Sequence, residues 1–208
     1  ISLGLVGSEM CIRDRIIVWG IQPYKNTRED VTYIRCPNEH DLIMEFMSFW
    51  TKNYPDVITG WNTDFFDIPY LANRIKQVCG EDKMRELSPW KNVSSKQIYS
   101  MGRNHLMYDI MGVSQYDYLQ LYQKFTYTRQ ESYKLDYIAS VELGEKKDEN
   151  PYETFREWYE NDFQSFIDYN IQDVEIVDKL EDKMGLIDLA LTMALSLIHI
   201  SEPTRPNE

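Results

Sequence analysis

Residues 56–70 read DVITGWNTDFFDIPY, and this stretch decides the fold of the chain. The run from Val57 to Thr59 is β-branched and is bounded by Gly60, which predicts a short buried strand. Apolar residues then recur at helical spacing and predict a helix that Gly80 ends. These residues are Ile68, Leu71, Ala72, Ile75 and Val78.

Asp67 lies between the two predicted elements, at the start of the helix, where Pro69 is tolerated in the first turn. One interpretation makes Asp67 only the N-cap of that helix. The other makes it a functional carboxylate, since α/β folds tend to place metal or substrate chemistry at the carboxyl ends of buried strands. Position alone favours the N-cap.

The rest of the chain alternates between the same two kinds of element. Residues 16–21 and 31–35 predict strands, and Asn38 is placed to cap a helix that stops at Tyr54-Pro55. Extended runs at 97–101 and 106–114, around the turn at 102–104, predict a β-hairpin. Helices are predicted at 116–125, 135–143 and 162–184. This order predicts an α/β layered domain.

The two ends of the chain do not belong to this pattern. Residues 5–15, LVGSEMCIRDR, and 195–205, LSLIHISEPTR, can be encoded by DNA segments that are reverse complements of each other. Such inverted ends resemble transposon-derived sequencing adapters read through as coding sequence. We therefore expect residues 1–15 and 195–208 to be adapter-derived and non-native, and the chain between them to be a fragment cut at both ends.

Composition excludes several classes of function. The formal net charge is −12, so the chain is not a general polyanion binder. With three histidines in all, one of them at 199, histidine-based triads and multi-histidine metal sites are poor hypotheses. No stretch reaches membrane-spanning length, so no membrane partner is expected.

A second candidate motif lies on the long helix predicted at 162–184. Tyr169 and Asp173 are four residues apart and so share a face of that helix. This Y-x-x-x-D is the only one among the chain's 15 tyrosines. Alone it is weak evidence, because an acidic, tyrosine-rich chain can contain one by accident.

Together the two motifs resemble a known pair. Asn62-Thr63-Asp64-Phe65-Phe66-Asp67 and, about a hundred residues later, Tyr169-Asn170-Ile171-Gln172-Asp173 are similar to the second and third exonuclease motifs of family B DNA polymerases. Segments such as 117–119 (DYL), 121–122 (LY) and 124–125 (KF) look like the replicative polymerases of T-even-type phages.

The resemblance implies a fold and a division of the chain. The fold is an RNase H-like α/β exonuclease fold, with a mixed sheet flanked by helices and a β-hairpin insertion, lacking its first strands. Residues 16–184 would be a 3′–5′ proofreading exonuclease domain truncated at its N-terminus. Residues 185–194 would begin the connection to the polymerase palm.

The resemblance also implies an active site of the DEDDy type, which removes the 3′-terminal nucleotide with two divalent cations, Mg²⁺ or Mn²⁺. Asp173 would ligate the metal that activates the attacking water, and Asp67 would support the second. Tyr169 would orient that water. Asn62 and Phe66 would contact the terminal nucleotide.

The hairpin and the partners follow from the same resemblance. In this family a corresponding hairpin helps to keep primer and template apart, which makes Arg103 a candidate DNA contact; the sequence alone favours a plain surface hairpin. The partners would be the single-stranded 3′ end of a DNA primer, the rest of the polymerase chain and a sliding clamp bound through a C-terminal part. The location would be the cytoplasm of an infected bacterial host.

One motif of the family is missing. No Asp-x-Glu pair, which supplies the other two carboxylates, lies on a predicted strand, and we expect it upstream of Ile16. The chain by itself is therefore expected to have little or no exonuclease activity. Two alternatives stay open: a stand-alone DEDDy nuclease, and a non-catalytic, decayed exonuclease-like module.

Overall fold

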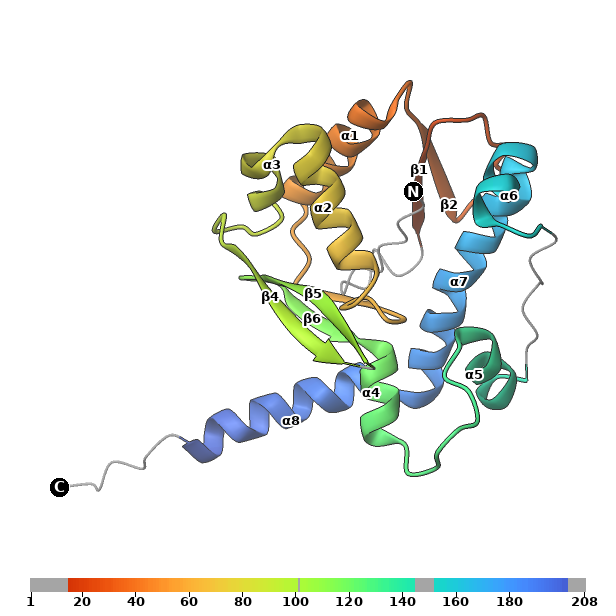
Figure 1. Cartoon of the computed structure of the whole chain (residues 1–208). Coiled ribbons are helices and arrows are strands. Elements are labelled where there is room, and N and C mark those ends of the chain that lie inside the picture. The colour runs from red at the N-terminus through yellow and green to blue at the C-terminus, as the bar shows by residue number, and fades with distance from the viewer. Residues whose placement is uncertain (1–14, 101, 145–151, 202–208) are drawn as a thin grey trace.

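The computed structural model describes residues 15–100, 102–144 and 152–201 of the 208-residue chain. Strands and helices are interspersed along these ranges, which confirms the mixed α/β class (Figure 1). The strands form three separate two-stranded sheets: β1 with β2, β3 with β6, and β4 with β5. The prediction of one mixed sheet is wrong for the described residues, because no described strand joins the β1–β2 pair to the β3–β6 pair.

The N-terminal part of the described chain consists of two strands and a helix. Strands β1 (Ile16–Gly20) and β2 (Val31–Arg35) pair in parallel. Helix α1 (Glu39–Lys52) begins where predicted, because the Asn38 side chain accepts a hydrogen bond from the Asp41 amide at 2.9 Å. Its buried face packs against Trp19 and against α2, and so fixes the position of the helix that follows the deciding stretch.

The deciding stretch folds into β3 (Val57–Gly60), a turn, and α2 (Asp67–Cys79), and short α3 (Glu81–Arg85) follows. The strand and the helix were predicted, but all four residues of β3 are half-buried rather than buried. Strand β3 pairs only with β6 among the described strands, so it is not enclosed on both sides. Gly80 ends α2 at φ 92°, a left-handed conformation that favours glycine.

The predicted hairpin is present with different bounds. Strands β4 (Val93–Ser100) and β5 (Arg103–Ile110) pair antiparallel, while Met101 lies outside the described residues. The second strand of the predicted hairpin, 106–114, covers parts of two separate strands in the structure. Strand β5 ends at Ile110, and another strand, β6 (Ser114–Asp117), begins at Ser114. Strand β6 runs parallel to β3, and α4 (Tyr118–Phe125) follows it directly.

The C-terminal half is helical. Helices α5 (Leu135–Glu142), α7 (Phe163–Met184) and α8 (Leu186–Ser201) follow α4. Helix α6 (Phe155–Asn161) was not predicted, because seven residues with one buried side chain give no helical period. Helix α8 runs past residue 194, the predicted end of the native chain.

Three apolar clusters hold these elements together. The first joins α1, α2, α3 and β5, the second joins α4, α5, α7 and the start of α8, and the third packs β1 and β2 on the first half of α7. Helix α7 belongs to two of the clusters, so it spans the molecule opposite α2 (Figure 1). In the described ranges no helix combines the length and the apolar character needed to cross a membrane.

Candidate active site between the β3–α2 turn and helix α7

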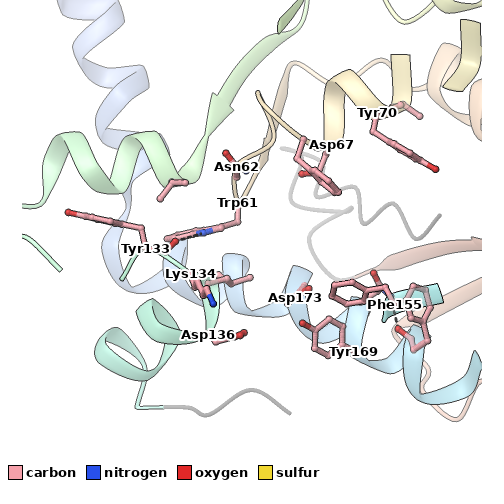
Figure 2. Close-up of a pocket in the computed structure, with 16 residues that line it drawn as sticks. Trp61, Asn62, Asp67, Tyr70, Tyr133, Lys134, Asp136, Phe155, Tyr169 and Asp173 are labelled. Carbon is pink, nitrogen blue, oxygen red and sulfur yellow. Dashed lines mark hydrogen bonds between the residues drawn. The ribbon is translucent and has the colours of Figure 1, made fainter. Parts of the chain in front are cut away.

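A cleft of about 870 Å³ brings the two sequence motifs together. One side is formed by the β3–α2 turn and the start of α2, and the other by α6 and α7, with α4 and the start of α5 closing one end (Figure 2). Five of the six predicted site residues line it: Asn62, Phe66, Asp67, Tyr169 and Asp173. Residues more than a hundred positions apart in the sequence therefore share one cavity.

Asp67 is the first residue of α2 and not its N-cap, so the N-cap interpretation is wrong. The N-cap position is Phe66, which makes no side-chain capping hydrogen bond. Backbone carbonyls of the turn accept hydrogen bonds from the amides around the helix start instead. Phe66 N donates to Asn62 O at 3.1 Å, and Ile68 N donates to Thr63 O at 3.0 Å. The carboxylate of Asp67 is thereby left available to the cleft that it lines.

The environment of Asp67 disfavours its charged form. The pKa of Asp67 is raised to about 6, and burial is the largest cause. The negative charges of Asp117 and Asp173 also raise this pKa, while a hydrogen bond from the backbone N–H of Asp67 lowers it. A carboxylate repelled by two others in a partly buried cleft is one that a bound cation would stabilise. The Asp67–Asp173 interaction therefore links the two motifs electrostatically as well as in space.

Tyr169 and Asp173 lie one turn apart on α7, half-buried, and face the cleft opposite Asp67 (Figure 2). The Tyr169 ring packs edge-on against buried Trp158 of α6, with ring centroids 4.7 Å apart. Trp158 Nε1 donates to Ser165 Oγ at 2.7 Å, which ties α6 to the start of α7. Helix α6 thus supports the tyrosine from behind.

Asn62 and Phe66 occupy the turn itself. Asn62 has φ 66°, the left-handed region that asparagine tolerates better than most side chains. Phe66 is 65% exposed although it is large and apolar, and its ring stacks on that of Tyr70, which is 50% exposed. Exposed aromatic rings beside a cleft are suited to stacking on nucleic acid bases.

Arg103, the sixth predicted residue, is elsewhere. It opens β5 at the tip of the hairpin, is exposed, and does not line the cleft. Any contact between Arg103 and DNA would therefore lie outside the cleft.

Sequence reasoning missed two residues that support the site. Asp117 is 3% exposed, and its carboxylate accepts hydrogen bonds from the Asn62 and Leu119 amides. The helix was predicted at 116–125 and begins at Tyr118, so the sequence carried no sign of a capping role for Asp117 or of its contact with the turn. Trp158 was missed with α6, and its own sequence context carries no signal either.

The described residues supply part of a metal site. Carboxylate oxygens are the ligands that Mg²⁺ and Mn²⁺ prefer, so Asp67 and Asp173 fit such ions in chemistry. Within the described ranges, however, no three histidine, cysteine, aspartate or glutamate side chains are grouped so that they could hold a metal ion. Further oxygen ligands would have to come from water, from substrate or from carboxylates outside these ranges.

Comparison with known proteins relates the chain to DNA polymerases. Residues 11–138 match the family model for the DNA polymerase family B exonuclease domain. The DNA-directed DNA polymerase of Escherichia phage RB69 is 40% identical over 167 residues, and that of Enterobacteria phage T4 is 41% identical over 165; each match covers 79% of this chain. The DNA polymerase delta catalytic subunit of Candida albicans is 36% identical over 118 residues, which cover 53% of this chain.

The matched region is a small part of each relative. The chain spans 18% of each phage relative and 11% of the yeast relative. The family model reaches Asp67 and Asp117 but ends before Tyr169 and Asp173.

Proposed function

The chain belongs to the exonuclease domain family of the family B DNA polymerases, and we propose that it is the 3′–5′ proofreading domain of a replicative, phage-type DNA polymerase. Its substrate would be the unpaired 3′ end of a primer strand, from which the terminal nucleotide is hydrolysed. The phage relatives support this proposal because each is named a DNA-directed DNA polymerase.

One observation carries the proposal. Asp67 begins α2 and Asp173 lies on α7, yet the two carboxylates line one cleft and the charge of Asp173 raises the pKa of Asp67. Tyr169, one helical turn before Asp173, lines the same cleft. A plain structural carboxylate on either helix would need no such partner.

The residues have separate tasks in the proposed reaction. Asp67 and Asp173 would hold divalent cations, which when bound activate water and stabilise the leaving 3′ oxygen. The Tyr169 hydroxyl would orient the attacking water. Asn62 would contact the terminal nucleotide, and Phe66 would stack on its base, which is worth about 1–3 kcal/mol for a base on an aromatic side chain.

The finer fold and the boundaries are also proposals. We infer an RNase H-like fold, supported by the parallel pair β3–β6 with the functional turn at its carboxyl end and by α7 across the cleft. The domain would cover residues 16–184, with 185–194 leading toward a polymerase palm. The end segments 1–15 and 195–208 would be non-native, although α8 continues through the second boundary as far as Ser201.

Two carboxylates are half of the set that this chemistry uses. We therefore propose that the chain by itself is inactive, for want of the Asp-x-Glu pair, while the polymerase to which it belongs proofreads. Retention of Asp67, Tyr169 and Asp173 in one cleft favours this over a decayed module. The hairpin β4–β5 favours a polymerase domain over a stand-alone nuclease.

A complementation experiment tests the proposal. The segment that precedes the matched region in the phage RB69 polymerase would be fused ahead of Ile16, and metal-dependent shortening of a 5′-labelled single strand would be followed on gels. We expect trimming by the fusion, none by the chain alone, and none by the fusion carrying Asp173→Ala. A folded fusion that does not trim would refute the function, and trimming by the unfused chain that Asp173→Ala abolishes would refute the inactivity.

The partners follow the same proposal. The primer 3′ end would enter the cleft, the rest of the polymerase would adjoin α8, and a sliding clamp would bind outside this chain. The phage relatives support the cytoplasm of an infected bacterium as the place of action.

A further inference from the structure

We propose that Asp117 is a positioning residue of the cleft, whose carboxylate holds the turn that carries Asn62 and thereby fixes where the terminal nucleotide binds. The inference rests on the proposed function, because it assigns Asn62 to that nucleotide. Asp117 itself does not line the cleft.

The sheet brings Asp117 to the turn. Strands β3 and β6 run parallel and in register, so Gly60, the last residue of β3, lies beside Asp117, the last residue of β6. The chain leaves β3 into the turn and leaves β6 into α4 at the same edge. The Asp117 side chain, 3% exposed, is therefore enclosed between the two departing segments.

Both oxygens of the carboxylate reach the turn. Oδ1 accepts from the Asn62 amide at 2.9 Å and from the Leu119 amide at 3.0 Å. Oδ2 accepts from the Asp64 amide and from Gln120 Nε2, each at 3.4 Å. One buried group thus joins the start of α4 to two amides of a turn more than 50 residues earlier in the chain.

Asn62 needs such an anchor. In the described ranges, Asn62 and Lys91 are the non-glycine residues with positive φ. A left-handed conformation is unfavourable for a residue with a side chain, so surrounding interactions must select it. The hydrogen bond from the Asn62 amide to the buried Oδ1 of Asp117 supplies this selection.

The simpler account is that Asp117 only caps α4. A cap needs one side-chain oxygen on one amide near the helix start, and the Leu119 amide meets that need. The cap does not explain why the same oxygen also accepts from Asn62, or why the second oxygen lies within reach of Asp64. It also does not require a buried charge, since serine and asparagine cap equally well.

Substitutions separate the two roles. Asp117→Asn keeps Oδ1 and can serve both the cap and the Asn62 amide. Asp117→Ser keeps a capping oxygen, but its single short hydroxyl cannot also reach the turn. Asn38→Ser is the matched control, because it changes the capping side chain of α1, which does not line the cleft.

The test uses the full 208-residue chain and binding, so it does not depend on activity. A short fluorescein-labelled oligothymidylate with a free 3′ end is titrated with each variant in calcium, and affinity is read from fluorescence anisotropy. We expect affinity to fall about tenfold or more for Asp117→Ser, and to stay within about threefold for Asp117→Asn and Asn38→Ser. Amide hydrogen exchange should quicken at Asn62 but not at Leu119 in Asp117→Ser.

Each outcome is decisive. Unchanged affinity in folded Asp117→Ser, or an equal loss in Asn38→Ser, would overturn the inference. If Asp117→Ser does not fold, Asp117→Asn decides: binding together with a protected Asn62 amide supports it, and binding with an unprotected Asn62 amide overturns it. Failure of the unsubstituted chain to bind the oligonucleotide would instead count against the proposed function itself.

Discussion

The two walls of the cleft are held in place by different forces. The turn wall, residues 60–67, is held by directional hydrogen bonds to the carboxylate of Asp117 and to its own carbonyls. The helix wall, α6 with the Tyr169 and Asp173 face of α7, is held by aromatic packing around Trp158. One wall depends on geometry at a few polar atoms, and the other on apolar surface removed from water.

This difference predicts how each wall should fail. Losing packing on the helix wall should reduce the stability of the whole domain, because cavities in a packed cluster are costly. Losing a hydrogen bond on the turn wall should instead displace the site within a domain that stays folded. Predictions that measure stability and binding separately can therefore distinguish the walls.

The largest effect is expected for Trp158→Ala on the helix wall. Trp158 is 2% exposed, and its removal should lower the free energy of unfolding by about 3–5 kcal/mol, measured by urea denaturation. Trp90→Ala is the control, since Trp90 is 69% exposed and its loss should change stability by less than about 0.5 kcal/mol. Equal losses for the two tryptophans would mean that α6 does not support the wall.

A smaller effect of opposite sign is expected for Asp67→Asn on the turn wall. Folding raises the pKa of Asp67 to about 6, so the stability gained from its protonated form is present below the ordinary aspartate pKa of about 3.9 and is lost as the pH rises through 6. The amide imitates the protonated form. The variant should match the unsubstituted chain near pH 4 and exceed its stability at pH 7.5, by on the order of 1–3 kcal/mol.

Urea denaturation at both pH values measures this, with exposed Asp56→Asn as the control. Identical pH dependence in Asp67→Asn and the unsubstituted chain would contradict a raised pKa. A stability gain on removing a partly buried charge is expected of a residue that serves binding rather than folding.

The sequence predicted the elements of both walls better than their supports. Local signals sufficed for β3, α2 and α7, because each has a hydrophobic period and a recognisable end. The N-cap assignment of Asp67 was wrong because backbone carbonyls of the turn accept the hydrogen bonds from amides at the start of α2. No residue pattern predicts such bonds. The pairing of Tyr169 with Asp173 was found because helical spacing is fixed.

The supports depend on contacts that are distant in the sequence. Asp117 falls inside the helix predicted at 116–125, and its contacts with the turn require that β6 lie in register with β3, which no local pattern specifies. Trp158 lies in a seven-residue helix too short to show a period. The described strands form three separate pairs rather than one sheet. Whether two pairs join into one sheet depends on a strand that pairs with both, and a local residue pattern does not show this.

The turn wall, rather than the helix wall, is expected to bind the base of the terminal nucleotide. Phe66→Ala should weaken oligothymidylate binding by about fivefold to about 150-fold, since base stacking on an aromatic ring is worth about 1–3 kcal/mol and about 1.4 kcal/mol is a factor of ten. Phe155, 58% exposed on the helix wall, should matter less when truncated, because its ring also packs on Trp158 and Tyr169. Fully exposed Tyr127, outside the cleft, provides the control as Tyr127→Ala. A larger loss for Phe155→Ala would reverse the assignment of the walls.

The smallest effect is expected for Arg103→Ala, which alters neither wall. Arg103 lies exposed at the hairpin tip, so its truncation should leave stability and oligothymidylate binding in the cleft unchanged. If it contacts a phosphate of primer–template DNA, the slope of log affinity against log salt should become shallower by about one for that substrate alone. Exposed Arg85→Ala, on α3 and ion-paired with Glu81, is the matched control. An unchanged slope would leave the hairpin a surface feature, as the sequence alone favoured, and would confine DNA binding to the two walls.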